Sequence, residues 1–197
     1  MKLALLIEYD GTDLSGWQFQ ENGRSVQSEL EQGFVQLFGK ILPEGKASVT
    51  GAGRTDAGVH ARGMVAHVDL PDDLPMTLRK LLMAINATTA ADVVVRDLRT
   101  VPEDFHARHS AIRRQYRYTI TTERTALERQ FVWAVRGRFD AELAKQAATL
   151  LQGELDFTSF SKRSNDVRHY RCHIVDAHWE FTARRAEFVI AANRFVR

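Results

Sequence analysis

Gly51-Ala52-Gly53-Arg54-Thr55-Asp56-Ala57-Gly58-Val59-His60-Ala61 sets one carboxylate among small residues, beside an arginine and a threonine. Glycines at three of the first eight positions exclude a helix interior, because glycine loses too much backbone entropy there. Short apolar runs precede and follow the stretch, at 47–50 and 64–70. The pattern therefore predicts a tight loop between two strands, with Asp56 held at its tip.

The chemistry open to Asp56 follows from its neighbours. Arg54 lies two positions away, and a nearby cation favours the charged form of a carboxylate. A fixed, ionised carboxylate can act as a nucleophile. The stretch lacks the second carboxylate of a glycosidase pair, although the alternative that Asp69 or Asp72 lies close in space stays open. The neighbouring His and Cys ligands of a zinc site are also missing. The alternative is structural, with Asp56 capping a turn and Arg54 pairing with it.

The residues around this loop predict the order β-α-β-β-α-β, the split arrangement of ferredoxin-like domains. Apolar residues recur at helical spacing in two segments, and Ser25 and Thr77 are the expected N-caps. The predicted elements are a strand over Leu3–Tyr9, a helix over Val26–Phe38, strands on both sides of the loop, a helix over 78–85 and a strand over Val93–Val95.

The second half begins to repeat this order but ends before completing it. The predicted elements are a strand over Gln115–Thr121, a strand over Phe131–Val135, a helix from about 140 to 153, and a hairpin of His173–Phe181 with Glu187–Ala191. No linker separates the halves. We therefore expect an α+β fold of two ferredoxin-like halves, 1–104 and 105–197, which share one continuous, mostly antiparallel sheet with helices on one side. The second half is expected to be incomplete at its C-terminus.

Composition limits the class of protein. The 197 residues include a single cysteine, Cys172, which excludes an internal disulfide and suits a reducing cytoplasm. No apolar run approaches the ~20 residues of a membrane span. The first residues lead too directly into Glu8 and Asp10 to form a signal peptide. We therefore expect a cytoplasmic globular protein, and no motif in the sequence indicates a metal or a cofactor.

The charge is unevenly distributed. Residues 1–100 carry three more acidic than basic side chains, whereas residues 101–197 carry five more basic than acidic ones. The excess is arginine, which suits phosphate recognition, and a basic face is typical of nucleic-acid binding. A solvated surface is the alternative. The clustered arginines are Arg108, Arg113, Arg114, Arg117, Arg124, Arg129, Arg136 and Arg138.

Several stretches resemble the TruA family of tRNA pseudouridine synthases, in the right order along nearly the whole chain. Gly53–Ala61 is very similar to the catalytic motif of that family. The other matching stretches are Tyr9-Asp10-Gly11-Thr12, Gly16-Trp17-Gln18-Phe19-Gln20, Ser25–Glu31, Phe105–Ala111 leading into Arg114–Tyr118, Asp156–Phe160 and Ala191–Phe195. Met64 and Leu155 depart from the usual Gln and His, and the chain ends at Arg197, before the segment whose arginine pairs with the catalytic aspartate in the family.

The resemblance implies that uridines at positions 38, 39 and 40 of the tRNA anticodon stem-loop are converted to pseudouridine. Asp56 would be the nucleophile, attacking either C1′ of the sugar or C6 of the base. Arg54 would help to flip the target base out of its stack, and Tyr116 would stack on that base and accept the proton from its C5. For Tyr116 the residues alone also allow an ordinary core aromatic. His60 and Thr55 are expected to shape the loop.

The partners implied are tRNA and a second copy of the chain in a homodimer. Candidate RNA-binding residues are Arg54, Arg62, Arg108, Arg113, Arg114, Arg117, Trp17 and Gln18, although Trp17 is equally suited to packing. Two other functions stay open: an RNA-binding module without catalysis, and a ferredoxin-like protein whose Gly51–Gly58 loop binds a phosphorylated metabolite. The latter lacks a helix directly after the glycines, where such anions are bound.

Overall fold

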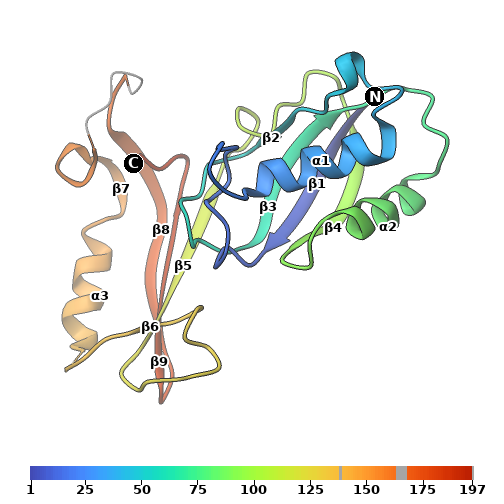
Figure 1. The fold of residues 1–197 in the computed structure, drawn as a ribbon. Coiled ribbons are helices and arrows are strands. Elements are labelled where there is room, and N and C mark those ends of the chain that lie inside the picture. Colours follow the sequence, from blue (N-terminus) through green and yellow to red (C-terminus); the bar gives the residue numbers. More distant parts are fainter. Residues whose placement is uncertain (138, 163–167, 197) are drawn as a thin grey trace. The chain divides into compact units, whose positions relative to one another are not determined.

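The computed structural model describes the whole chain except residues 138, 163–167 and 197. It divides into two compact units, Met1–Ala111 and Ile112–Arg197, each with a sheet of its own (Figure 1). The predicted boundary lay after residue 104. Residues 105–111 instead belong to the first unit, because they pack on His67 of its sheet.

The first unit has the predicted order β-α-β-β-α-β. Its elements are β1 (Lys2–Tyr9), α1 (Val26–Phe38), β2 (Val49–Gly51), β3 (Ala61–Asp69), α2 (Leu78–Thr88) and β4 (Val93–Val101), with a short 3₁₀ helix over Pro43–Gly45. The strands lie in the order β2-β3-β1-β4 and every neighbouring pair is antiparallel. This is the split arrangement of a ferredoxin-like domain.

Local sequence explains why α1 begins where it does. The Ser25 hydroxyl accepts a hydrogen bond from the Ser28 N–H at 3.1 Å, and the Ser28 hydroxyl accepts one from the Ser25 N–H at 3.0 Å. This reciprocal capping satisfies two N–H groups that the helix itself leaves unpaired. Leu30 and Phe34, four positions apart, are fully buried on the face that α1 turns to the sheet.

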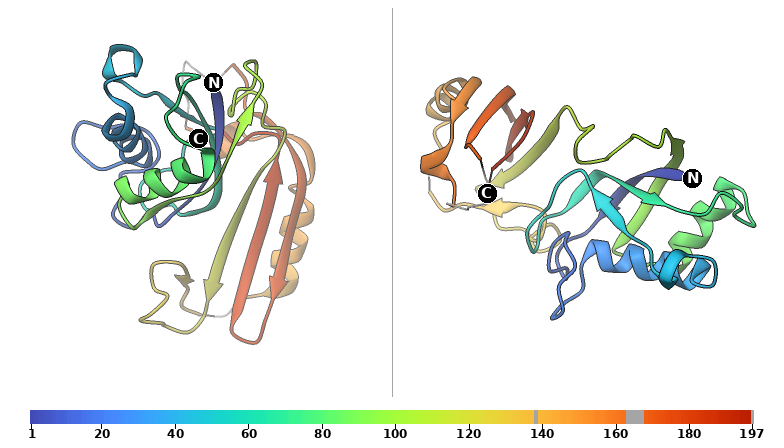
Figure 2. Two further views of the ribbon diagram at one scale, coloured as in Figure 1. Left: turned by 90° about the vertical axis from the view of Figure 1, so that its right-hand side faces the viewer. Right: turned by 90° about the horizontal axis from the view of Figure 1, so that it is seen from above.

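Both helices of the first unit cover the same face of its sheet, as the view from above in Figure 2 shows. Leu3, Leu5 and Ile7 alternate along β1 and are buried beneath them. The core of this unit is therefore one layer between the sheet and the helix pair. The loops at the ends of the strands lie outside that layer, and one of them carries Asp56.

The second unit is built on a different strand order. Its elements are β5 (Arg114–Thr121), β6 (Trp133–Ala134), α3 (Ala141–Thr149), β7 (Gly153–Asp156), a 3₁₀ turn over Thr158–Phe160, β8 (Arg171–Phe181) and β9 (Arg185–Ala192). Within the described residues the order is β6-β5-β9-β8-β7, with only the short β5–β6 pair parallel. The predicted hairpin is β8 with β9, whereas β7 was not predicted.

The strands do not form the single continuous sheet that the sequence suggested. The described residues form two hydrogen-bonded sheets, one in each unit. The chain leaves β4 at Pro102, which has no N–H to continue a ladder. β5 then pairs with β9 of its own unit. No helix in the described part of the chain is both long enough and apolar enough to cross a membrane.

Candidate active site

Asp56 lies in the loop that joins β2 to β3, as predicted, and its side chain is exposed. Arg54 is exposed as well, whereas Thr55 between them is only 9% exposed. The chain therefore alternates here, so that the carboxylate and the guanidinium reach solvent while the threonine faces inward. β3 follows the loop directly, so the glycines are not followed by the helix N-terminus that a phosphate-binding loop requires.

Thr55 is fastened to the protein on two sides. Its hydroxyl forms a 2.8 Å hydrogen bond with the hydroxyl of Tyr9, a residue that is 3% exposed at the end of β1. Its carbonyl accepts a hydrogen bond from the Trp17 N–H at 3.0 Å. Because Thr55 precedes Asp56 in the chain, these two bonds fix the backbone from which the carboxylate projects.

The backbone of the loop after β1 packs directly against the backbone of the Asp56 loop. Gly16 has φ +98°, and a Cβ at this position would lie 2.5 Å from the Thr55 carbonyl oxygen. A Cβ at Gly11 would lie 2.2 Å from the Val59 carbonyl oxygen. Both glycines therefore allow a close approach that no other residue permits. The two stretches Tyr9–Gln20 and Gly51–Ala61 thus form one interlocked structure.

His60 closes the other end of the same loop. Its Nδ1 lies 3.1 Å from the Gly11 N–H and 3.0 Å from an Asp10 carboxylate oxygen. The ring of His60 therefore joins the end of the Asp56 loop to Asp10 and Gly11 after β1. Hydrogen bonds from the Thr12 hydroxyl and N–H, together with His60, hold the pKa of Asp10 below its usual value despite some desolvation. His60 and Thr55 therefore shape the loop.

Trp17 is a core residue rather than an RNA-binding one. It is 3% exposed, its ring lies where a Cβ of Gly51 would come within 2.5 Å, and it contacts Tyr9 with a centroid distance of 6.4 Å. Such a ring offers no face to a nucleotide base. The packing alternative is correct for Trp17, while the neighbouring Gln18 is exposed.

The first unit also presents two of the other predicted RNA-binding residues. Arg62 is exposed at the beginning of β3, and Arg108 is exposed in the segment that follows β4. Arg54, Asp56, Arg62 and Arg108 therefore all reach solvent from one unit. The backbone around Arg108 is held by His106, whose Nδ1 accepts hydrogen bonds from the Arg108 N–H at 3.2 Å and the His109 N–H at 3.4 Å.

The remaining predicted residues belong to the second unit. Tyr116 on β5 is half-buried and meets the ring of Phe195 edge-on, with centroids 5.0 Å apart and planes at 85°. Arg114 donates to the Asn193 carbonyl at 2.8 Å, so this arginine secures the end of β9. Arg117 pairs with Glu187 at 2.5 Å across the β5–β9 ladder.

Arg113 donates to Gln115 at 2.9 Å and lies 3.9 Å from Asp176. Carboxylates of the same sheet therefore offset part of the positive charge of Arg113 and Arg117. The uncompensated positive charge of this sheet is therefore smaller than the number of its arginines suggests.

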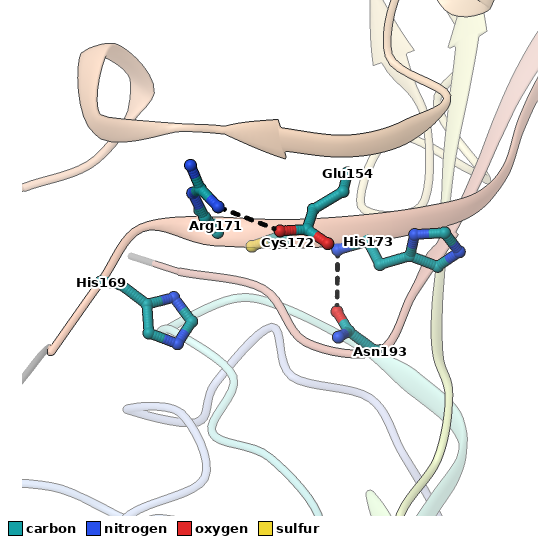
Figure 3. A pocket seen from close by; sticks show the side chains of 6 residues that line it. All are labelled: Glu154, His169, Arg171, Cys172, His173 and Asn193. Carbon is teal, nitrogen blue, oxygen red and sulfur yellow. Dashed lines mark hydrogen bonds and ion pairs between the residues drawn. The ribbon is translucent and has the colours of Figure 1, made fainter.

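A separate open pocket of about 410 Å³ lies at the ends of β7, β8 and β9 (Figure 3). Glu154, His169, Arg171, Cys172, His173 and Asn193 line it. Arg171 lies 3.4 Å from Glu154, so the charges in the pocket are paired. Burial raises the pKa of the Cys172 thiol and keeps it protonated, which does not suit a nucleophile. In the described part of the chain, no three His, Cys, Asp or Glu side chains are grouped to bind a metal ion.

Comparison with known proteins identifies close relatives. A family model described as tRNA pseudouridine synthase matches residues 5–110. The chain is 40% identical over 198 residues to tRNA pseudouridine synthase A of Porphyromonas gingivalis, which covers 100% of this chain and 77% of that relative. It is 46% identical over 160 residues to tRNA pseudouridine synthase A of Syntrophotalea carbinolica, a match that covers 80% of this chain and 61% of that relative. The tRNA pseudouridine synthase A of Parabacteroides distasonis is 37% identical over 196 residues, a match that covers 98% of this chain and 74% of that relative.

Proposed function

The chain belongs to the tRNA pseudouridine synthase A family, and on this basis we propose that it isomerises uridine to pseudouridine in the anticodon stem-loop of tRNA with Asp56 as the nucleophile. The observation that carries the proposal is the position of Asp56. Its carboxylate is exposed, while the residue before it is buried and hydrogen-bonded. A nucleophile for an everted nucleotide must be accessible and rigidly held, and this loop meets both requirements.

The reaction rearranges bonds within one nucleotide. The bond between N1 of the base and C1′ of the sugar breaks, the uracil turns, and a bond forms between C5 and C1′. The proton on C5 leaves and N1 gains one, so no atom is gained or lost. Attack of Asp56 on C1′ gives a glycosyl ester, which C5 displaces when the new C5–C1′ bond forms. Attack on C6 instead gives an adduct on the base, from which the carboxylate is eliminated after the C5–C1′ bond has formed. The carboxylate is regenerated at the end of the cycle.

Two further side chains have proposed roles in the same reaction. Removing the target base from its stack costs a few kcal/mol, and Arg54, exposed two positions from Asp56, is suited to assist this step. Tyr116 stacks on the everted base and accepts the proton from C5. Stacking of a base on an aromatic ring contributes about 1–3 kcal/mol, which is enough to offset much of the flipping cost. The half-buried ring of Tyr116, held edge-on by Phe195, leaves part of its surface accessible.

The substrate is recognised mainly through its phosphates and shape. Exposed Arg54, Arg62 and Arg108 supply the cations of the first unit, and Gln18 is exposed in the same unit. We propose that positions 38, 39 and 40 of tRNA are the targets, that the enzyme works in the cytoplasm, and that two copies of the chain form a homodimer around the tRNA. Arg113, Arg114 and Arg117 add contacts from the second unit.

The test is mass-spectrometric mapping of pseudouridine in tRNA treated with the wild type, Asp56→Asn, Asp56→Ala and the control Asp73→Asn, which alters another exposed aspartate. We expect both Asp56 variants to form no pseudouridine and to bind tRNA with near wild-type affinity, and the control to keep full activity. Turnover by Asp56→Ala would disprove the nucleophile. Binding of tRNA without conversion by the wild type would instead indicate an RNA-binding module.

A further inference from the structure

A buried histidine helps to attach the segment Phe105–Ala111 to the sheet of the first unit. His67 lies on β3 and is 6% exposed. Its Nδ1 accepts a hydrogen bond from the N–H of Ala107 at 3.2 Å, and Ala107 is 2% exposed. The ring of Phe105 meets His67 edge-on at a centroid distance of 6.2 Å. The segment is therefore docked on the ring by both a hydrogen bond and an aromatic contact.

The geometry requires a neutral imidazole. Nδ1 can accept from Ala107 only while it carries no proton, so the proton of the ring resides on Nε2. Burial, followed by the neighbouring His106 and Lys2, lowers the pKa of His67, while Asp69 and a backbone hydrogen bond with Thr50 oppose the shift. These are the charged and titratable groups around the ring, together with His109, whose ring contacts that of His106 at a centroid distance of 4.3 Å. The net effect lowers the pKa and so favours the neutral ring that the contact with Ala107 needs.

The same ring is linked to the strand that leads to Asp56. Thr50 is the residue paired with His67 in the β2–β3 ladder. A backbone hydrogen bond with Thr50 raises the pKa of His67, so the ring lies beside the backbone of this residue. β2 ends at Gly51, immediately before the loop with Arg54 and Asp56. His67 thus lies next to Thr50 of the strand that leads into the Asp56 loop and also holds Ala107 of the Phe105–Ala111 segment.

The docked segment has a fixed internal shape that presents Arg108. His106 accepts from the N–H groups of Arg108 and His109, and the Ser110 hydroxyl accepts from the His106 N–H at 3.1 Å. Lys2 donates to the carbonyls of Glu103 and Phe105 and secures the beginning of the segment. Arg108 follows the anchored Ala107 directly and is exposed.

We propose that His67 is a positioning residue, which docks the Phe105–Ala111 segment through the hydrogen bond from Ala107 and thereby orients Arg108 toward a phosphate of the bound tRNA. The proposal depends on the proposed function only for the identity of the ligand. The docking itself is a property of the free protein and can be measured without RNA. His67 acts through Arg108 and does not contact the reacting nucleotide.

Two variants separate the two nitrogens of the ring. Asparagine places its carbonyl oxygen near the position of Nδ1 and keeps an acceptor for Ala107, whereas glutamine reaches the position of Nε2 and loses that acceptor. The first measurement is hydrogen exchange of the Ala107 amide by NMR in the free protein. We expect His67→Asn to protect this amide much as the wild type does, and His67→Gln to speed its exchange by about tenfold, the factor that one hydrogen bond of ordinary net strength supplies.

The second measurement is tRNA binding with single-turnover pseudouridine formation. We expect His67→Gln to weaken tRNA binding by up to about tenfold and to leave the rate of the bound complex within about twofold of wild type, because only a binding contact is displaced. Arg108→Gln should weaken binding in the wild type but not in the His67→Gln background, since the two changes affect one contact. Circular dichroism confirms that each variant is folded.

Several results would overturn the proposal. Equal Ala107 exchange in the asparagine and glutamine variants would show that Nδ1 does not dock the segment. Faster exchange with unchanged tRNA affinity, or additive losses in the His67→Gln/Arg108→Gln double variant, would show that docking does not orient Arg108. If the wild type binds tRNA without converting it, the proposed function fails, while the exchange and affinity measurements still decide the role of His67.

Discussion

Removing the hydrogen bond between Tyr9 and Thr55 should weaken both the fold of the first unit and the reaction. The two hydroxyls lie 2.8 Å apart, and the residues are 3% and 9% exposed. Tyr9→Phe leaves the Thr55 hydroxyl without this partner in a buried place, which costs about 1–3 kcal/mol. Thr55→Val removes the same hydrogen bond from the side of Thr55. Each single variant should therefore lower the free energy of unfolding by about 1–2 kcal/mol.

A double-mutant cycle isolates the bond itself. Replacing both partners with apolar groups of similar shape removes the mismatch, so the double variant should lose about 1 kcal/mol less than the sum of the single losses. Urea unfolding gives these values. The catalytic effect should lie mainly in the rate, because the loop of Asp56 shifts while the proposed tRNA contacts outside it, Arg62 and Arg108, remain in place.

The rate is measured as single-turnover pseudouridine formation with the enzyme in excess. A displacement of the nucleophile approaching 1 Å costs up to about 100-fold, so we expect at least about a tenfold loss for Tyr9→Phe, with tRNA affinity within about twofold of wild type. Strictly additive stability losses, or an unchanged rate in both single variants, would refute the view that Tyr9 holds the Asp56 loop in place.

Two further changes test other contacts. Gly16→Ala should lower the free energy of unfolding by more than about 2 kcal/mol, because the backbone has φ +98° and the new Cβ would lie 2.5 Å from the Thr55 carbonyl oxygen. The control Gly53→Ala should change this free energy little, since no atom lies within 4 Å of the new Cβ. Chemical denaturation compares the two variants. Because burial lowers the pKa of His67, the unfolded chain binds a proton more readily than the folded protein as pH falls below about 6.5, so stability should decline with falling pH. Unfolding curves from about pH 7.5 to 5.5 should show a flatter decline of stability for His67→Asn than for the wild type. An equal slope in the two proteins would contradict this reasoning.

The first unit could be predicted from sequence because its signals are local. Ser25 before an apolar helical repeat predicted α1 over Val26–Phe38, and the structure has the same bounds. The glycine-rich stretch predicted the loop of Asp56 for a similar reason. Such signals depend on a few neighbouring residues, whose backbone preferences are enough to decide the outcome.

The second unit was harder because strand pairing is not local. Nothing near β5 in the sequence indicates that it pairs with β9, about 70 residues later, and the expected continuous sheet was wrong for this reason. β7 was missed because Gly153, with φ +93°, was taken only as the end of a helix. Leu155, the only aliphatic residue of β7, gives too weak an alternation to predict so short a strand.

In the candidate site, the sequence indicated the exposed residues but not the buried residues that hold them in position. Asp56, Arg54 and Arg62 are exposed as expected. The partner of Thr55 is Tyr9, 46 positions away, and only the folded chain brings the two together. Trp17 was proposed for RNA because tryptophan suits both stacking and packing, and burial decides between them.

The interlock between the loop after β1 and the Asp56 loop has a consequence for protein engineering. Backbone atoms of both stretches are in contact, and the glycines at 11 and 16 leave no room for adjustment. A graft of residues 51–61 alone into another scaffold would transfer the carboxylate without residues 9–20, which hold its loop in position. Transplanted or recombined versions of this enzyme should therefore exchange residues 9–20 and 51–61 as a single module, and chimeras that cross over between them should assemble poorly.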